Sequence, residues 1–506
     1  MSKVLLRGAA LLLAASLLAG TAQAQWRQPR PRPVSVPVNL AALDQALLLT
    51  VDDGRSGQEL WRVDPTTLQA SPVADIRPGA LGSHPSQPVR FGAQACFAAN
   101  DGSSGYELWC SDGQTDGTRR VADIHPGAGD SVPTALTVLG GQLVFVADDG
   151  AHGFELWRSD GTASGTRLLA DLLPGAQGAN PRELTRVGQQ LFFVADDGQR
   201  GAELWVTDGS AAGTRLVKDI QPGPAAAAPT RLTAVGDRLF FVANDGRHGH
   251  ELWTSDGTAA GTRLVRDIHA GAASARPAHL VAWGSQLYFA ADDGRSGLEL
   301  WTSNGRRQGT RRVADIHPGP GHAVPAHLTV AAGALAFAAT DGQGPVRLWR
   351  SDGTAAGTRP MAGAMQPLAA AAALAARAQA SEEAPVRLAV PGGEVPNRLQ
   401  ADGQRLLYAA IDDAAGYELW TSDGSVAGTR RLADLAPGPA DSFPHQFTRL
   451  GQQLFFVADD AQGHTALWCE QAYGRIVRVV LPNAATAAAA SASDAAGPGA
   501  PLKPGA

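Results

Sequence analysis

Tryptophan returns at a fixed interval through most of this chain, and that interval restricts the fold more than any other feature. Nine tryptophans mark the period, and each follows the one before it by 48 residues, except for one gap of 71. They are Trp61, Trp109, Trp157, Trp205, Trp253, Trp301, Trp349, Trp420 and Trp468. Self-similarity at a period of about 20–50 residues is typical of repeat architectures. The 506 residues are therefore expected to form one array of supersecondary units rather than three or four unrelated domains.

The unit from Pro229 to Ile268 shows what each repeat contains. It predicts four short strands, separated by turns rich in Asn, Asp and Gly: Leu232–Val235, Leu239–Ala243, Glu251–Thr254 and Thr262–Ile268. Asx-Gly pairs supply the positive φ that tight hairpin turns require. Four antiparallel strands on short turns describe one blade of a β-propeller. A β-solenoid would use parallel strands and a shorter period, and a row of β-sandwiches would need about 100 residues per domain.

The sequence thus predicts an all-β fold, a propeller of four-stranded antiparallel blades over residues 38–482. All nine units contain four candidate strands, including the first, where Leu40–Leu43 and Leu47–Val51 supply two of them. The ninth unit departs most from the pattern, with Ala466 in place of the usual Glu. We favour nine blades, and an eight-bladed ring with one displaced terminal unit is the alternative.

Four segments lie outside the repeat. Residues 1–24 combine Lys3 and Arg7, an apolar run and Ala22-Gln23-Ala24, the pattern of a cleaved secretory signal peptide. Residues 25–37 form a Pro/Arg-rich leader. Residues 360–396 are an Ala-rich insertion, and residues 483–506 are an Ala/Ser/Gly/Pro-rich tail expected to be disordered. We therefore expect an exported protein that is periplasmic, at the cell surface or extracellular.

The net charge and the hydropathy pattern restrict the kinds of partner that we expect for this chain. The chain has 42 basic and 48 acidic residues, a net charge of −6, so it has no basic field that would indicate nucleic-acid binding. The apolar run near the N-terminus is shorter than the 18–20 or so residues that span a bilayer, and no later segment qualifies. We expect neither a nucleic-acid partner nor a membrane span.

An aspartate stands eight residues before every marker tryptophan, and it allows two interpretations. Carboxylates and turn carbonyls are ligands suited to calcium, and the candidates are Asp149, Asp197, Asp245 and Asp293. However, the spacing does not match a D-x-[DN]-x-[DN]-G calcium loop. Aspartates also accept hydrogen bonds from backbone N–H groups in tight turns. We favour the turn interpretation, so we expect no cofactor and keep calcium as the alternative.

Cysteines and histidines offer few candidates for chemistry. Cys96 and Cys110 flank a predicted hairpin and could form a disulfide, whereas Cys469 has no evident partner. His279 and His327 occupy the same phase of the repeat. They could belong to a histidine belt that lines a substrate site, but we favour solvent-facing loop histidines. No G-x-S-x-G, H-E-x-x-H, P-loop or paired-cysteine zinc pattern is present. We therefore assign no catalytic residue.

The repeated segment itself resembles a known family. Glu155–Thr166 (ELWRSDGTASGT) and Glu251–Thr262 (ELWTSDGTAAGT) are similar to the ELWxxDGT repeat of exported bacterial proteins. The resemblance covers nearly all of Leu40–Leu481 and weakens around Trp61, around Asn304 and in the last unit. It implies a secreted or surface-associated propeller and adds no catalytic residue.

The sequence therefore favours a non-enzymatic exported scaffold that uses one propeller face to bind a protein or a glycan. Propeller faces are built from loops, where recognition commonly lies. One alternative is a polysaccharide hydrolase or lyase with its site in the central channel. The other is a calcium-dependent adhesion protein.

Overall fold

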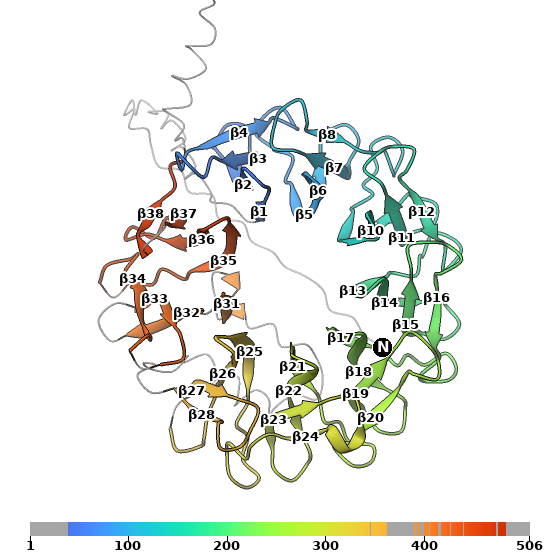
Figure 1. Ribbon diagram of the computed structural model, residues 1–506. Helices are drawn as coiled ribbons and strands as arrows, with labels where there is room; N and C mark the ends of the chain where they lie inside the picture. Colours follow the sequence, from blue (N-terminus) through green and yellow to red (C-terminus); the bar gives the residue numbers. More distant parts are fainter. Residues whose placement is uncertain are drawn as a thin grey trace, which may run out of the picture.

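Nine blades form a closed ring in a computed structural model of the protein (Figure 1). The structure describes residues 39–361 except 345, residues 399–481 except 404, 413–415, 426, 439 and 472–473, and the short strands β29 (Ala389–Val390) and β30 (Gly393–Glu394). Each blade is a four-stranded antiparallel sheet whose strands pair in chain order. The predicted fold class is confirmed, with nine blades and not eight. The predicted signal peptide, leader and tail, and all but the first two residues of the insertion apart from β29 and β30, lie outside the described residues.

The first strand of each blade lies nearest the centre of the ring (Figure 1). These inner strands are β1 (Ala41–Ala42), β5 (Ser86–Phe91), β9 (Thr134–Leu139), β13 (Arg182–Val187), β17 (Thr230–Val235), β21 (Ala278–Trp283), β25 (Ala326–Ala331), β31 (Gln400–Asp402) and β35 (His445–Leu450). The second strands are β2 (Leu47–Asp52), β6 (Gln94–Asn100), β10 (Gln142–Asp148), β14 (Gln190–Asp196), β18 (Arg238–Asn244), β22 (Gln286–Asp292), β26 (Ala334–Ala339), β32 (Arg405–Asp412) and β36 (Gln453–Asp459).

The third strands carry the marker tryptophans, and the fourth strands form the outer rim. The third strands are β3 (Gln58–Val63), β7 (Tyr106–Ser111), β11 (Phe154–Ser159), β15 (Ala202–Thr207), β19 (His250–Ser255), β23 (Leu298–Ser303), β27 (Arg347–Ser351), β33 (Gly416–Ser422) and β37 (Thr465–Glu470). The fourth strands are β4 (Ala70–Ala74), β8 (Arg119–Arg120), β12 (Arg167–Ala170), β16 (Arg215–Lys218), β20 (Arg263–Arg266), β24 (Arg311–Arg312), β28 (Arg359–Pro360), β34 (Arg430–Ala433) and β38 (Ile476–Arg478). One short 3-10 helix, η1 (Arg307–Gly309), precedes β24.

The hydrophobic core lies between the blades. Phe192 and Leu204 of the fourth blade pack with Leu239, Phe241 and Trp253 of the fifth, and the same arrangement recurs around the ring. The second strands are buried on both faces, which explains their continuous apolar sequences. Because each tryptophan fills the space beside a neighbouring blade, the 48-residue period records the packing of one blade on the next.

The ring closes between the first and ninth blades. Gln69 pairs with Val480 as a parallel bridge, and the Ala70 N–H donates to the Val480 carbonyl at 3.0 Å. Leu49 and Trp61 of the first blade also share a core with Phe455 of the ninth. The divergent last unit is therefore a full blade, and an eight-bladed ring is wrong.

Candidate functional site

A buried glutamate layer holds seven of the nine connections between blades. In the fifth blade, the Glu251 carboxylate accepts hydrogen bonds from the N–H groups of Ile268, His269 and Ala275 at 3.0–3.2 Å. The members of this layer are Glu59, Glu107, Glu155, Glu203, Glu251, Glu299 and Glu418. Each precedes its marker tryptophan by two residues. Each accepts hydrogen bonds from the loop that leads to the next blade.

Burial raises the pKa of these glutamates. The pKa rises to about 7 for Glu203 and Glu251 and to about 8 for Glu299, chiefly because desolvation disfavours the charged form. A raised carboxyl pKa is typical of a general acid. Here, however, the oxygens accept hydrogen bonds from the loop that leads to the next blade, with the exception of Glu155 Oε2 among the described residues, so the glutamate layer serves the fold.

The four aspartates considered for calcium lie in the hairpin turns and bind backbone N–H groups. Asp149 Oδ1 accepts hydrogen bonds from the N–H groups of Ala151 and His152, both at 2.9 Å. Asp197, Asp245 and Asp293 accept equivalent bonds in their own turns. Burial acts to raise the pKa of Asp149, but these hydrogen bonds bring it below its ordinary value. Among the described residues, no three His, Cys, Asp or Glu side chains gather as a metal-binding set.

The cysteines and several loop histidines also have defined places. Cys96 of β6 and Cys110 of β7 are cross-strand partners and form a disulfide, with a Cα–Cα distance of 4.0 Å. Cys469 is buried, and burial raises the pKa of its thiol to about 12. His152 and His248 contact Asp149 and Asp245 through Nδ1 at 2.8 Å. These histidines pair with turn carboxylates, and they do not activate a hydroxyl or a thiol.

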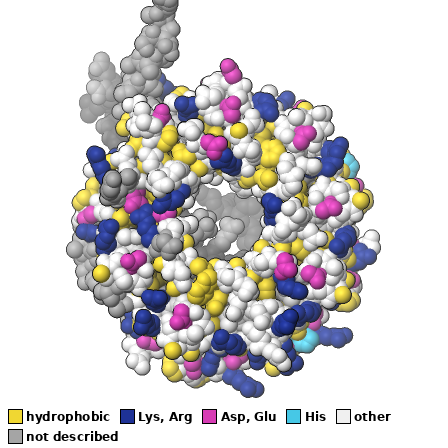
Figure 2. Space-filling view, in the orientation of Figure 1, with side chains coloured by type: hydrophobic (Ala, Val, Ile, Leu, Met, Phe, Trp, Pro, Cys, Tyr) yellow, Lys and Arg dark blue, Asp and Glu magenta, His cyan; other side chains and the backbone are white. Residues whose placement is uncertain are grey.

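The units differ near the inner strands, at the position 22 residues before each marker tryptophan. We call the described residues at this position the collar: Asn39, Gln87, Ala135, Glu183, Arg231, His279, His327 and Gln446. The corresponding residue of the eighth blade, Arg398, lies outside the described residues. Figure 2 shows the opening that the inner strands surround. The repeat thus keeps its turn aspartate in every unit and is variable beside the central opening.

Every collar residue has left-handed backbone geometry, with φ between +51° and +82°. For every collar residue except Asn39, which precedes β1, the cause is a β-bulge. In the fifth blade, Thr230 and Thr233 pair with Val242 and Phe240, so the inner strand has one extra residue there. Glycine is the usual residue at a left-handed bulge position, and other residues cost about 1–3 kcal/mol. None of the eight collar residues is glycine, so the ring keeps side chains here despite the strain.

The side chains of four collar residues, which we call the bridging arc, form hydrogen bonds between neighbouring blades. Gln446 Oε1 accepts a hydrogen bond from the Asn39 N–H at 3.1 Å, and Asn39 Nδ2 donates to the Pro85 carbonyl at 3.2 Å. Gln87 Oε1 accepts from the Ala135 N–H at 3.4 Å, and Glu183 Oε2 accepts from the Leu232 N–H at 3.0 Å. The bridging arc consists of Asn39, Gln87, Glu183 and Gln446, and its role is structural.

Three further collar residues, Arg231, His279 and His327, lie on consecutive blades and form what we call the open arc. The rings of His279 and His327 contact each other, with centroids 5.7 Å apart and an interplanar angle of 48°. Burial, and then the charges of His327 and Arg231, lower the pKa of His279 to about 4. The prediction that these histidines face solvent from loops is wrong, because both lie on inner strands. The His279 imidazole is therefore neutral at pH 7 and can accept a proton.

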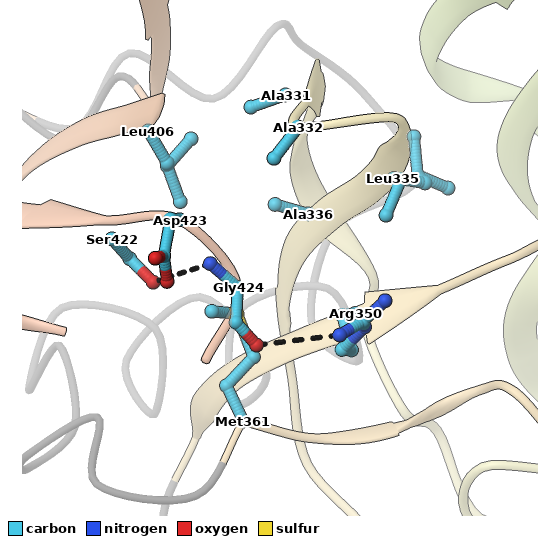
Figure 3. A pocket seen from close by; sticks show the side chains of 11 residues that line it. Ala331, Ala332, Leu335, Ala336, Arg350, Met361, Leu406, Ser422, Asp423 and Gly424 are labelled. Carbon is cyan, nitrogen blue, oxygen red and sulfur yellow. Dashed lines mark hydrogen bonds between the residues drawn. The ribbon is translucent and has the colours of Figure 1, made fainter. Parts of the chain in front are cut away.

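A small cavity between the seventh and eighth blades is the second place where packing departs from the repeat (Figure 3). Its volume is about 20 Å³, room for one water molecule. Ala331 and Ala336 line it, where the fifth blade has Val235 and Phe240. The Arg350 guanidinium closes one side by donating to the Gly424 carbonyl at 3.3 Å. Because small side chains explain the cavity, we interpret it as a packing defect.

An ion-pair cluster joins the eighth and ninth blades. Asp402 is 6% exposed, and it accepts hydrogen bonds from Arg405 at 2.6 and 2.8 Å and from Arg449 Nη2 at 2.7 Å. Arg405 also donates to Glu470 at 2.8 Å. Burial acts to raise the pKa of Asp402, but the two guanidinium groups hold it below its ordinary value. All four side chains are used within the cluster, so it is a structural contact between blades.

Comparisons with known proteins reach no family. No protein-family model and no curated protein matches the chain, so the resemblance to ELWxxDGT-repeat proteins stays a prediction. Among solved structures, the chain is similar to a puromycin hydrolase, with 17% identity, a TM-score of 0.36, and coverage of 77% of this chain and 58% of that one. It is also similar to a puromycin-hydrolysing peptidase of Mycobacterium tuberculosis (14% identity, TM-score 0.35, 74% and 58% covered).

A third similar structure is the β-propeller domain of the Trilobed protease from Pyrococcus furiosus (10% identity, TM-score 0.33, 66% and 100% covered). The chain spans less than three fifths of the length of the puromycin hydrolase. Likeness at this level concerns the fold alone.

This comparison corrects the prediction of a non-enzymatic binding scaffold. The solved structures that share the propeller are named as hydrolases and peptidases, so a propeller without a familiar catalytic motif does not indicate a protein without enzymatic function. The error came from treating uniform repeats as evidence against chemistry.

Sequence reasoning missed Arg231 and the shared strand position of the collar. A signal was present, because the position 22 residues before each tryptophan varies while the residue after it is leucine in seven of the nine units. A proline two residues earlier, present in all nine units, marks the start of the inner strand. The bulge that turns this position left-handed depends on strand pairing, which no local pattern reveals.

Among the described residues, no helix is long and apolar enough to cross a membrane.

Proposed function

We propose that this protein hydrolyses peptides, and that the open arc of the collar is where an extended peptide segment is held. The observation that carries the proposal is the pair of touching imidazoles, one of them neutral, beside a cation on strained backbone.

The inner strands supply the surface for a peptide backbone. β17, β21 and β25 each pair with one strand of their own blade, so their other edges are strand edges toward the centre of the ring. Such an edge offers N–H and C=O groups that an extended peptide can match. In the bridging arc, collar side chains cover the N–H groups of Asn39, Ala135 and Leu232. The edges near His279 and His327 are therefore the better candidates for peptide pairing.

The open arc also has groups for acid–base chemistry. A neutral His279 can take a proton from a water molecule that attacks a peptide carbonyl carbon. The imidazolium then returns this proton to the amine that leaves as the C–N bond breaks. Arg231, an exposed residue in the same arc, adds positive charge that holds an anionic group of the peptide beside the imidazoles.

The test is a peptide-hydrolysis assay on the purified full chain. Unlabelled peptide mixtures would be incubated with the protein, and cleavage would be followed by mass spectrometry. Loss of a general acid–base group costs about 10²–10⁴-fold in rate, so we expect His279→Ala to lose at least about 100-fold in kcat. Gln87→Ala, a collar residue of the bridging arc, is the matched control and should keep its activity. Absence of turnover by the wild-type protein, or equal turnover by His279→Ala, would overturn the proposal.

A further inference from the structure

Arg231 is a cation without a carboxylate partner on the described part of the ring. Of the four other described inner-strand arginines, three have partners: Arg90 pairs with Asp44 at 2.6 Å, Arg449 pairs with Asp402, and Arg186 donates to the Gly188 carbonyl at 2.8 Å. The fourth, Arg182, lies outside the collar. No described carboxylate lies within 4.0 Å of the Arg231 guanidinium, although Arg231 is exposed and lies in the collar. Its positive charge nevertheless helps to lower the pKa of His279.

The neighbouring carboxylate does not neutralise this charge. Glu183 occupies the collar position of the preceding blade, and its Oε2 accepts a hydrogen bond from the Leu232 N–H at 3.0 Å. On the other side lie the His279 and His327 rings. The open arc therefore carries one positive charge and imidazole nitrogens, with no negative charge of its own.

We propose that Arg231, His279 and His327 form an anion site for a carboxylate, and that it takes the C-terminal carboxylate of a peptide. A guanidinium binds a planar carboxylate through two parallel N–H groups, and a neutral imidazole can donate one more hydrogen bond. A metal ion fits this site poorly, because Arg231 repels a cation that two imidazoles would otherwise attract. Assignment of the carboxylate to a peptide rests on the proposed function, whereas the anion site stands on the residues alone.

The same carboxylate chemistry could come from an Asp or Glu side chain within a peptide, so the probes must separate the two sources. Three peptides of one length serve: Ala-Ala-Ala with a free C-terminus, its C-terminal amide, and Ala-Glu-Ala with a C-terminal amide. Affinity for the full chain would be measured by calorimetry. The C–H resonances of the histidine rings in NMR spectra would locate the binding.

We expect the free-acid peptide to bind at least about 10-fold more tightly than either amide, as for the loss of a charged hydrogen bond. Arg231→Gln should remove this preference and should abolish the NMR shift of the His279 ring. Arg186→Gln, the same substitution at an inner-strand arginine that already has partners, is the matched control and should keep the preference.

Each outcome separates this inference from the proposed function. Equal affinity for free acid and amides, or an unchanged preference in Arg231→Gln, overturns the C-terminal carboxylate site even if peptides are hydrolysed. Tight binding of the Ala-Glu-Ala amide instead assigns the site to an acidic side chain and overturns the C-terminal assignment. Binding of the free acid through Arg231 without any peptide hydrolysis supports the anion site and contradicts the proposed function.

Discussion

The glutamate layer and the collar use the same repeat in opposite ways. In the glutamate layer, seven blades carry the same residue, and each carboxylate is surrounded by backbone donors of its own blade. In the collar, the blades carry residues as different as Ala135, Glu183, Arg231 and His279 on an identical left-handed backbone. The backbone requirement is constant around the collar, but the side chain is not. Repetition therefore marks positions that build blades, whereas the variable collar position has different roles in different blades.

The collar itself divides in two. The polar side-chain atoms of the bridging arc form hydrogen bonds with a neighbouring blade, as Glu183 does with the Leu232 N–H. In the open arc, the His279 and His327 rings contact each other, and Arg231 has no carboxylate beside it among the described residues. Stability and function are thus expected to separate between residues 48 positions apart in the chain, and four measurements test this separation.

The largest effect is expected in the glutamate layer. Glu251→Ala would leave the buried N–H groups of Ile268, His269 and Ala275 without their acceptor. Each unsatisfied buried donor costs about 1–3 kcal/mol, so the loss of stability should exceed about 3 kcal/mol. Thermal unfolding and hydrogen exchange at these three amides would measure it. Arg347→Ala, at the same position of the seventh blade, breaks a half-exposed ion pair with Asp341 and should cost less than about 1 kcal/mol. Similar losses in both variants would contradict a special role for the glutamate layer.

The second effect is a pH dependence that arises in the open arc. The pKa of His279 is about 4 in the folded protein, below the 6.5 of a free histidine. Between these values the unfolded chain binds a proton that the folded ring does not bind, so stability falls as pH decreases from 6.5 to 4. The full shift corresponds to about 3 kcal/mol, and solvent at the partly exposed ring reduces this value. His279→Gln should flatten the slope of the unfolding midpoint against pH in this window. Gln87→Ala should leave the slope as in the wild type.

The third effect concerns the bridging arc. Glu183→Ala removes the acceptor of the Leu232 N–H, and we expect a loss of about 1–2 kcal/mol with faster hydrogen exchange at that amide. Arg231→Ala, one blade further on, should change stability by less than about 0.5 kcal/mol, because no described carboxylate pairs with it. Equal losses of stability in the two variants would contradict the division of the collar into a bridging arc and an open arc.

The smallest expected effect is a gain in stability rather than a loss. Replacing a collar residue by glycine removes the cost of left-handed backbone at a φ of +58° for Arg231. Arg231→Gly should therefore be more stable than Arg231→Ala by about 1 kcal/mol, while losing the function that we assign to the guanidinium. At Glu183, the φ is also +58°. Glu183→Gly should therefore be more stable than Glu183→Ala by the same amount, but it should stay less stable than the wild type. Chemical unfolding of the four variants would decide; a glycine variant less stable than its alanine counterpart would mean that the backbone is not strained.

Much of the blade could be predicted from local pattern. The turn Asn244-Asp245-Gly246 and the apolar run Leu239–Ala243 predict a hairpin, and β18 and β19 pair across it. The aspartate in that turn accepts the N–H groups of Arg247 and His248, as a turn aspartate should. Such features depend on residues close together in the chain, where sequence and contact coincide.

The number of blades and the site depend on distant contacts. Nine blades rather than eight follow from the pairing of Gln69 with Val480, which lie at opposite ends of the repeat. His279 and His327 were assigned to solvent because nothing near either residue in the chain shows its neighbour. Their contact requires the sixth and seventh blades to pack side by side. It also requires a β-bulge in each inner strand that orients the two imidazoles toward each other.

The sequence by itself determined the blade: its period, its strand order, its turns and its buried tryptophan, because each follows from hydrophobic pattern and turn chemistry within 48 residues. The tertiary structure alone decided where the blades meet, which collar side chains bond the backbone of the next blade, and that the His279 and His327 rings contact each other. The physical reason is that a bulge and a ring closure are properties of paired strands and packed sheets. No single repeat contains the partner that creates them.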